Sequence, residues 1–151
     1  RKAVRDKIVE MLSVITGVDV YSQRYTSYKT LPAINVRVGD GDGNYSSAEN
    51  MITRNLKVMV EIYTAGDQNS ERLESDQESA ADQVDRLIKA VEAILTTDRQ
   101  NLDGLTDGGD TFYRLRYLSE DLKEKPSVDQ TEEIYLRATL YYEGVYHKTL
   151  S

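Results

Sequence analysis

Histidine, cysteine and paired carboxylates supply most catalytic and metal-binding chemistry, and this chain contains few arrangements of them. It has no cysteine, which excludes a thiol nucleophile, a disulfide and a thiolate metal site. Its only histidine, His147, stands near the carboxyl terminus. A catalytic base must be held in fixed geometry, and a terminal segment is a poor place for one. The sequence therefore predicts no histidine-based site.

Carboxylates are abundant, with 26 acidic residues, so some of them must lie close together by chance. A working acid–base pair needs two different environments, usually with one carboxyl group buried in an apolar pocket, so that the two pKa values separate. Most acidic residues here fall on polar faces or in loops of the predicted elements. We therefore expect no catalytic residues, no enzymatic activity and no cofactor.

A polar, glycine-rich segment in the first half of the chain resembles the start of a calcium-binding loop. Asp40, Asp42 and Asn44 occupy the first, third and fifth ligand positions of an EF-hand. Tyr45 then stands where that loop needs a glycine, and Met51 where it needs a bidentate glutamate. The flanking segments are also predicted as strands rather than helices. A hairpin loop is the better interpretation, and no metal site is expected.

Tyrosine is unusually frequent, with 11 residues against one phenylalanine and no tryptophan. Its ring offers a large rigid contact area and its hydroxyl a polar tip, which suits surfaces that are first hydrated and later buried. Tyr135 and Tyr141 lie opposite the apolar face of the last predicted strand. They either cover a sheet face by cross-strand packing or contact a partner. The candidate partner-contact residues are Asp40, Asp42, Asn44, Tyr45, Tyr135 and Tyr141.

Two amphipathic helices are predicted to position these residues. Residues 1–16 carry apolar side chains at three- and four-residue intervals, and Gly17 follows where a left-handed cap ends a helix. Residues 75–96 carry a continuous apolar stripe and open with a capping box of Ser75 and Glu78.

Five strands are predicted from alternating apolar and polar residues. They span residues 18–26, 31–38, 55–63, 111–118 and 132–142. The second and third are expected to form a long hairpin around a loop at residues 39–50, and another loop is expected at 123–130.

Strands with one apolar face need helices on one side only. We therefore predict an α+β fold: a mostly antiparallel or mixed sheet of about five strands with two helices on one face, in the order α-β-β-β-α-β-β. Residues 1–151 are expected to form a single domain. The predicted core consists of Leu56, Val58, Val60, Ile62, Leu87, Ile88, Val91, Leu136 and Leu140.

The charge balance limits the partners. The formal net charge is −7, whereas proteins that bind nucleic acid by themselves usually have a basic surface that neutralises phosphates. No run approaches the roughly 18 apolar residues typical of a membrane-spanning helix, and no signal-peptide pattern opens the chain. We expect no membrane contact and no specific binding to DNA or RNA.

Taken together, these features resemble the tail terminator (tail completion) proteins of long-tailed bacteriophages, the lambda minor tail protein U family. The resemblance covers nearly the whole chain. It rests on the basic amphipathic start Arg1-Lys2-Ala3-Val4-Arg5-Asp6-Lys7-Ile8, on Leu31-Pro32-Ala33-Ile34-Asn35-Val36, and on Leu56-Lys57-Val58-Met59-Val60-Glu61-Ile62-Tyr63. The long second helix and the closing strand complete it.

The resemblance implies a structural function. Such proteins form a hexameric ring on the head-proximal end of the tail tube, stop tube polymerisation and provide the surface for head joining. The implied partners are further copies of the chain in a homo-hexamer, the tail tube protein, and a head–tail connector or head completion protein. The implied location is the virion tail, after assembly in the host cytoplasm. Six copies at −7 each carry −42 charges, and an acidic lumen would let DNA pass without specific binding.

Two other classes remain open from the residues. Another phage neck or baseplate adaptor of similar size would show the same patterns. A small ligand-binding or enzymatic α+β domain would need a pocket or a catalytic constellation, and the sequence does not indicate one.

Overall fold

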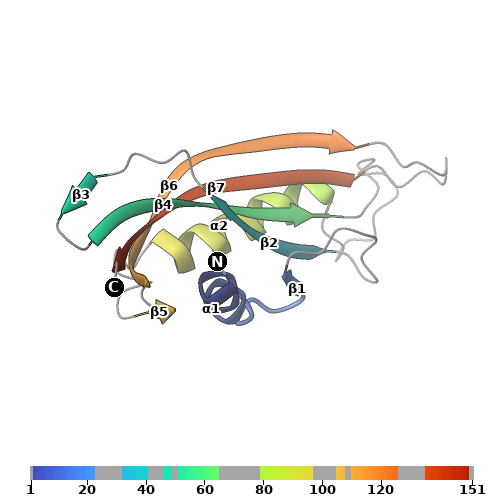
Figure 1. The fold of residues 1–151 in the computed structure, drawn as a ribbon. Coiled ribbons are helices and arrows are strands. Elements are labelled where there is room, and N and C mark those ends of the chain that lie inside the picture. Colours follow the sequence, from blue (N-terminus) through green and yellow to red (C-terminus); the bar gives the residue numbers. More distant parts are fainter. Residues whose placement is uncertain are drawn as a thin grey trace.

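The computed structural model describes residues 2–22, 32–40, 46–48, 51–64, 79–96, 105–107, 110–125 and 135–149. Within these ranges the chain forms two helices and seven strands (Figure 1). Their bounds are α1 Lys2–Leu12, β1 Asp19–Ser22, β2 Ala33–Asp40, β3 Ser46–Ala48, β4 Met51–Tyr63, α2 Ala80–Thr96, β5 Thr106–Asp107, β6 Asp110–Lys125 and β7 Tyr135–Thr149.

The strands form one mixed sheet in the order β1-β2-β4-β7-β6-β5, and β3 pairs with the start of β4. β1 runs parallel to β2, whereas the other pairs are antiparallel. The predicted hairpin of the second and third strands is confirmed, because β2 pairs with β4 from Ala33↔Tyr63 to Asp40↔Leu56. Apart from the short β3 and β5, the elements follow the predicted order, which confirms the α+β class.

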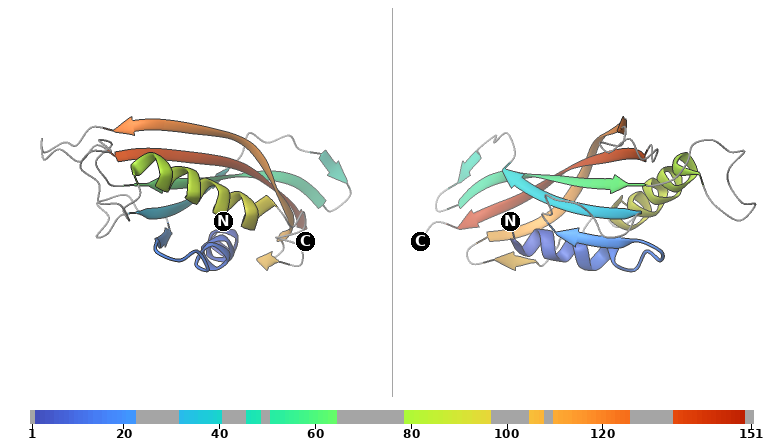
Figure 2. Two further views of the ribbon diagram at one scale, coloured as in Figure 1. Left: turned by 180° about the vertical axis from the view of Figure 1, so that it is seen from behind. Right: turned by 90° about the vertical axis from the view of Figure 1, so that its right-hand side faces the viewer.

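Both helices lie on the same face of the curved sheet (Figures 1 and 2). Helix α1 packs against β1 and β2, and α2 packs against β4, β6 and β7. The strands' inward residues meet the apolar stripes of the helices, as one-sided alternation requires.

The core between helices and sheet contains every predicted core residue. Seven of the nine are buried, while Ile88 and Leu136 pack against the cluster partly buried. Helix α1 adds Val4, Ile8 and Leu12, each without solvent exposure. Among the described residues, Tyr142 of β7 is the largest fully buried side chain.

The helix ends differ from the prediction. Helix α1 ends at Leu12, and the Ser13 N–H and hydroxyl both donate to the Val9 carbonyl of its last turn, at 3.0 and 2.6 Å. Gly17 has φ +75°, but it lies in the turn between α1 and β1 and does not cap the helix. Helix α2 starts at Ala80, and the Asp82 N–H donates to the Ser79 hydroxyl at 3.1 Å. Ser79 is therefore the N-cap, and the predicted capping box at residues 75–78 lies outside the described residues.

The strands also differ in length from the prediction. β1 is described only as far as Ser22, and β4 begins at Met51, directly after the predicted loop and four residues before the predicted start of the strand at residue 55. The predicted loop at 39–50 contains the end of β2 and the short β3. β6 continues to Lys125, into the predicted loop at 123–130. β7 runs to Thr149, seven residues beyond the predicted end at residue 142, and His147 pairs with Thr53 and Thr111 inside the sheet.

Candidate functional site

The candidate site is the face of the sheet that carries no helix, here called the open face. Its side chains alternate with the core residues along each strand. Described members include Asn35 and Arg37 of β2, Lys57, Met59, Glu61 and Tyr63 of β4, Arg116, Ser119 and Asp121 of β6, and Arg137, Thr139, Tyr141 and Glu143 of β7. The register places them in rows across neighbouring strands.

A buried carboxylate occupies one row of the open face. The Asn35 amide donates to Glu61 Oε1 at 3.1 Å, and the Tyr63 hydroxyl donates to Glu61 Oε2 at 3.0 Å. Arg37 Nε lies 2.9 Å from Glu61 Oε1 and forms an ion pair with it. The side chain of Glu61 is 9% exposed and that of Arg37 33%. Because Glu61 has three partners on two strands, it holds the Arg37 guanidinium in a defined place on this face.

The partners of Glu61 allow a test of its contribution to stability. Glu61→Gln removes the charge opposite Arg37 and keeps an acceptor oxygen for only one of Asn35 and Tyr63, because these two side chains donate to different oxygens of Glu61. We expect the free energy of unfolding, measured in urea, to fall by about 1–3 kcal/mol, as when a buried charge-assisted hydrogen bond loses one partner.

Glu143→Gln is the matched control for that measurement. Glu143 Oε2 accepts from Arg116 Nη2 at 2.6 Å, but the Arg116 side chain is 65% exposed. An exposed pair of this kind contributes about 0–1 kcal/mol. Equal losses of unfolding free energy in the two variants would show that the Glu61 cluster stabilises the fold no more than an exposed ion pair does.

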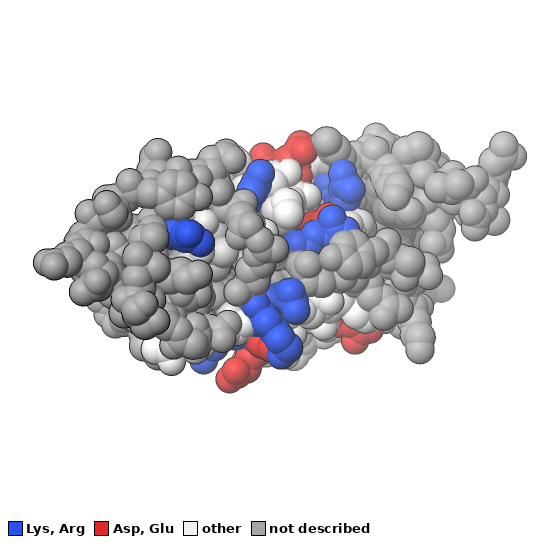
Figure 3. Space-filling view, in the orientation of Figure 1, with Lys and Arg blue, Asp and Glu red and all other residues white. Residues whose placement is uncertain are grey.

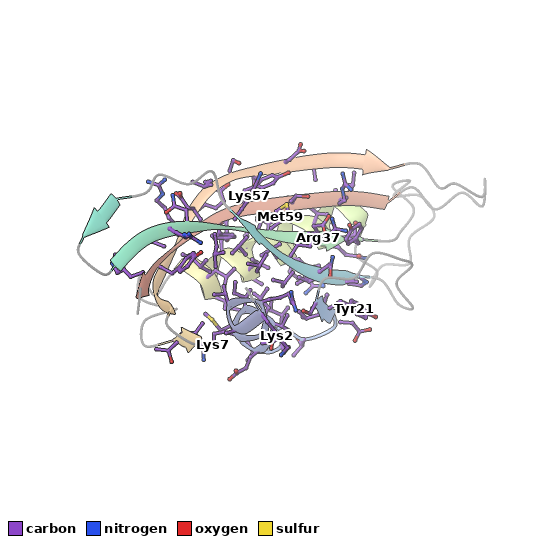
Figure 4. All side chains as sticks on the ribbon, in the orientation of Figure 1. Lys2, Lys7, Tyr21, Arg37, Lys57 and Met59 are labelled. Atoms are coloured by element: carbon purple, nitrogen blue, oxygen red, sulfur yellow. The ribbon has the colours of Figure 1, made fainter. Side chains whose placement is uncertain are left out.

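The centre of the open face combines an arginine, a methionine and a tyrosine. Arg37 pairs with Met59 in the β2–β4 register, and Met59 pairs with Tyr141 in the β4–β7 register. All three side chains are half-buried. Lys57 Nζ lies 5.4 Å from the centre of the Tyr141 ring, within the range of a cation–π contact. Arg37, Lys57 and Met59 are labelled on their strands in Figure 4. Arginine, methionine and tyrosine are enriched in protein–protein interfaces.

Charge is mixed rather than segregated on the side of the molecule that Figure 3 shows. Lys and Arg side chains are spread across its described part, with acidic residues between them. The excess of negative charge in the whole chain is therefore not gathered on this side among the described residues. This surface suits a protein partner better than a cation or a polyanion.

The candidate partner-contact residues are only partly placed. Tyr141 lies in the middle of the open face, half-buried, under Lys57. Asp40 and Tyr135 are placed by their backbones, at the end of β2 and the start of β7, and their side chains are outside the described part. Asp42, Asn44 and Tyr45 lie outside the described residues altogether.

Sequence reasoning missed the Glu61 cluster. The only available signal was an acidic residue on the polar side of a strongly alternating strand. Its partners Asn35 and Arg37 come from β2, 26 and 24 positions earlier in the chain. The strand register, which no local pattern specifies, brings them together.

Two tyrosines meet on the helix side of the sheet. The Tyr117 and Tyr142 rings pack edge to face, with centroids 5.6 Å apart. Burial raises the pKa of the Tyr142 phenol, and Glu92 and Tyr117 raise it further. Its hydroxyl has no hydrogen-bond partner among the described residues. Since the unfolded tyrosine ionises near pH 10 and the folded one does not, this group removes stability as the pH rises above about 10.

No group of three or more His, Asp or Glu residues among the described ones is placed to hold a metal ion. His147 is half-buried in β7. Neither described helix is long and apolar enough to span a membrane.

Comparison with known proteins gives no family assignment. No protein-family model matches the chain, and no curated protein matches it either.

Proposed function

We propose that this protein is a structural component of a phage tail: a terminator that forms a ring on the head-proximal end of the tail tube. The observation that carries the proposal is the asymmetry of the sheet. Helices cover one face, while the other face has an Arg–Met–Tyr centre and a pre-positioned ion pair. The sequence resemblance described above supports the same function.

A terminator needs surfaces for three partners, and the proposed partners are other copies of the chain, the tail tube protein and the head–tail connector or head completion protein. A closed ring needs a heterologous contact between two different patches of each subunit. The two ends of the mixed sheet offer two such different patches, because β1 stands at one end and β6 with the short β5 at the other. We assign the open face to contacts with the tube or the head. DNA passes through the lumen without specific binding, and the protein acts in the virion tail after assembly in the host cytoplasm.

Electron microscopy of purified protein with unterminated tail tubes tests the proposal. We expect six-fold rings on one end of each tube and no further growth when tube protein is added. Rings or particles on the baseplate end, or on heads alone, would instead identify the protein as an adaptor at that position of the virion. No binding to any phage structure would end the structural proposal.

A substitution in the centre of the open face makes the test specific. Met59→Glu places a charge between Arg37 and Tyr141. We expect its binding to tubes or heads to fall about tenfold or more, because a carboxylate is costly to bury in an interface in place of an apolar side chain. Lys89→Glu, on the exposed side of α2, is the control and should bind normally. Normal binding by both variants would place the contact elsewhere.

A further inference from the structure

Cations and acids are mixed on the open face, but they differ in exposure. In the Arg37–Glu61 pair the arginine side chain is 33% exposed and the glutamate side chain 9%. In the Arg116–Glu143 pair the two values are 65% and 20%. In both pairs the arginine is therefore the partner that solvent, or another protein, meets first, while the carboxylate is recessed behind it.

Two further cations of the open face have no acidic partner among the described residues. Lys57 is exposed, and its Nζ lies over the Tyr141 ring. Arg137, half-buried, stands opposite Tyr63 in the β4–β7 register, and no ion pair joins it to a described residue. A third acid of the face, Asp121, is half-buried like the other recessed carboxylates. The projecting charge of the described part of this face is therefore positive.

These cations stand around the apolar centre of the open face. Arg37 pairs with Met59 in the β2–β4 register, and Lys57 precedes Met59 by two positions on the same side of β4 (Figure 4). Arg137 precedes Tyr141 by four positions on the same side of β7, which is about 13 Å along a strand. An apolar centre with a charged rim is the usual layout of a protein–protein interface.

The sign of the rim fixes the sign of the partner. Coulomb attraction falls with distance, so a projecting guanidinium acts on an approaching surface more strongly than a recessed carboxylate does. The whole chain carries −7, so the exposed charge of this face is opposite in sign to that of the whole chain. Arginine donates paired hydrogen bonds to carboxylates. The complementary surface is therefore one that carries Asp and Glu side chains.

Phosphates would also match the charge, but the rest of the face favours a protein. Met59 and Tyr141 offer half-buried apolar surface at the centre, which suits side chains of a folded partner. Glu61 and Glu143 stay within the face, close to any anion bound there. Beyond the contact, a net charge of −7 repels a long polyanion.

We propose that the open face binds an acidic patch of its partner protein, with Arg37, Lys57 and Arg137 opposite carboxylates around the Met59–Tyr141 centre. This inference rests on the proposed function and adds to it the chemistry of the partner: the tube or head protein that meets the open face presents Asp and Glu side chains there.

Charge substitutions combined with a salt series test the proposal. Wild-type protein, Lys57→Glu, Arg137→Gln and Lys89→Glu, each checked for folding by circular dichroism, are sedimented with unterminated tail tubes and with heads. At about 0.1 M salt we expect Lys57→Glu to bind about five- to tenfold more weakly than the wild type, and Arg137→Gln about two- to fivefold more weakly. At about 0.5 M salt the differences should shrink to about twofold or less, because ions screen exposed charges.

Lys89→Glu is the matched control, because it changes the net charge as Lys57→Glu does but lies on the exposed side of α2. It should bind like the wild type. Normal binding of both Lys57→Glu and Arg137→Gln to tubes and heads would overturn the acidic contact and leave the terminator function intact. A wild-type protein that binds neither tubes nor heads would end the proposed function and this inference with it.

Two other occupants of the open face are excluded in the same samples. Binding of a short duplex DNA that Lys57→Glu abolishes would make nucleic acid the partner. Self-association of the wild type, measured by analytical ultracentrifugation and lost in Lys57→Glu, would make a second copy of the chain the partner. Either result would overturn the proposal.

Discussion

Loss of this protein is expected to produce phage tails of irregular and excessive length that do not join heads. If the protein forms the proposed ring, a tube end without it still presents the surface to which the next layer of tube protein binds, so addition continues until subunits run out. Tail lengths in electron micrographs of a gene-inactivated phage, compared with the wild type, measure the effect. Infectivity should fall to the background of the assay, since unjoined tails deliver no DNA.

Complementation provides the controls. Expression of the wild-type chain should restore tail length and head joining, and Lys89→Glu should do the same. Met59→Glu should fail in one of two ways. Loss of both length control and head joining would show that the open face contacts the tube, whereas normal length without joining would show that it contacts the head. Tails of normal length that join heads in the absence of the protein would contradict the terminator function, and an adaptor elsewhere in the virion would then explain the chain better.

Termination requires that the two ends of the ring differ. One end must resemble the tube well enough to bind it, while the other must not present the surface that recruits tube protein. The open face and the helix-covered face of this subunit carry different side chains, since one carries the Arg37–Glu61 pair and Tyr141 and the other is covered by the two helices. Binding of the first subunits to a tube end can also offset the entropy cost of association, so ring closure need not occur in free solution.

The fold was predictable because its strands and helices carry strong periodic patterns. Alternation from Leu56 to Ile62 sets one apolar face for β4, and the stripe through Leu87 and Val91 sets one for α2. The ends were less predictable. The polar run in β6 from Ser119 to Lys125 has no alternation, and its strand conformation comes from pairing with β7 rather than from local preference.

The candidate site was less predictable than the fold for a physical reason. Tyr141 was found because a strand's own alternation reveals which residues face away from the core. Arg37, Met59 and Glu61 become a site only through the register of β2, β4 and β7.

Deletion of one core side chain should cause a large loss of stability. Leu87 of α2 is fully buried, in a cluster with Val91 and the inward residues of β4 and β7. We expect Leu87→Ala to lower the free energy of unfolding by about 2–5 kcal/mol, because it loses the transfer energy of the removed methyl groups and leaves a cavity. Urea unfolding followed by circular dichroism measures the change.

Lys89→Ala on the same helix separates packing from helix propensity. Lys89 is exposed two residues after Leu87, and alanine is as good a helix former as lysine or better. Its effect should therefore stay within about 0.5 kcal/mol, the usual range for surface changes. If Leu87→Ala were as mild as Lys89→Ala, α2 could not be packed on the sheet with this face. The open face would then no longer be defined as the side opposite the helices. The assignment of the partner contacts to that face would therefore be wrong as well.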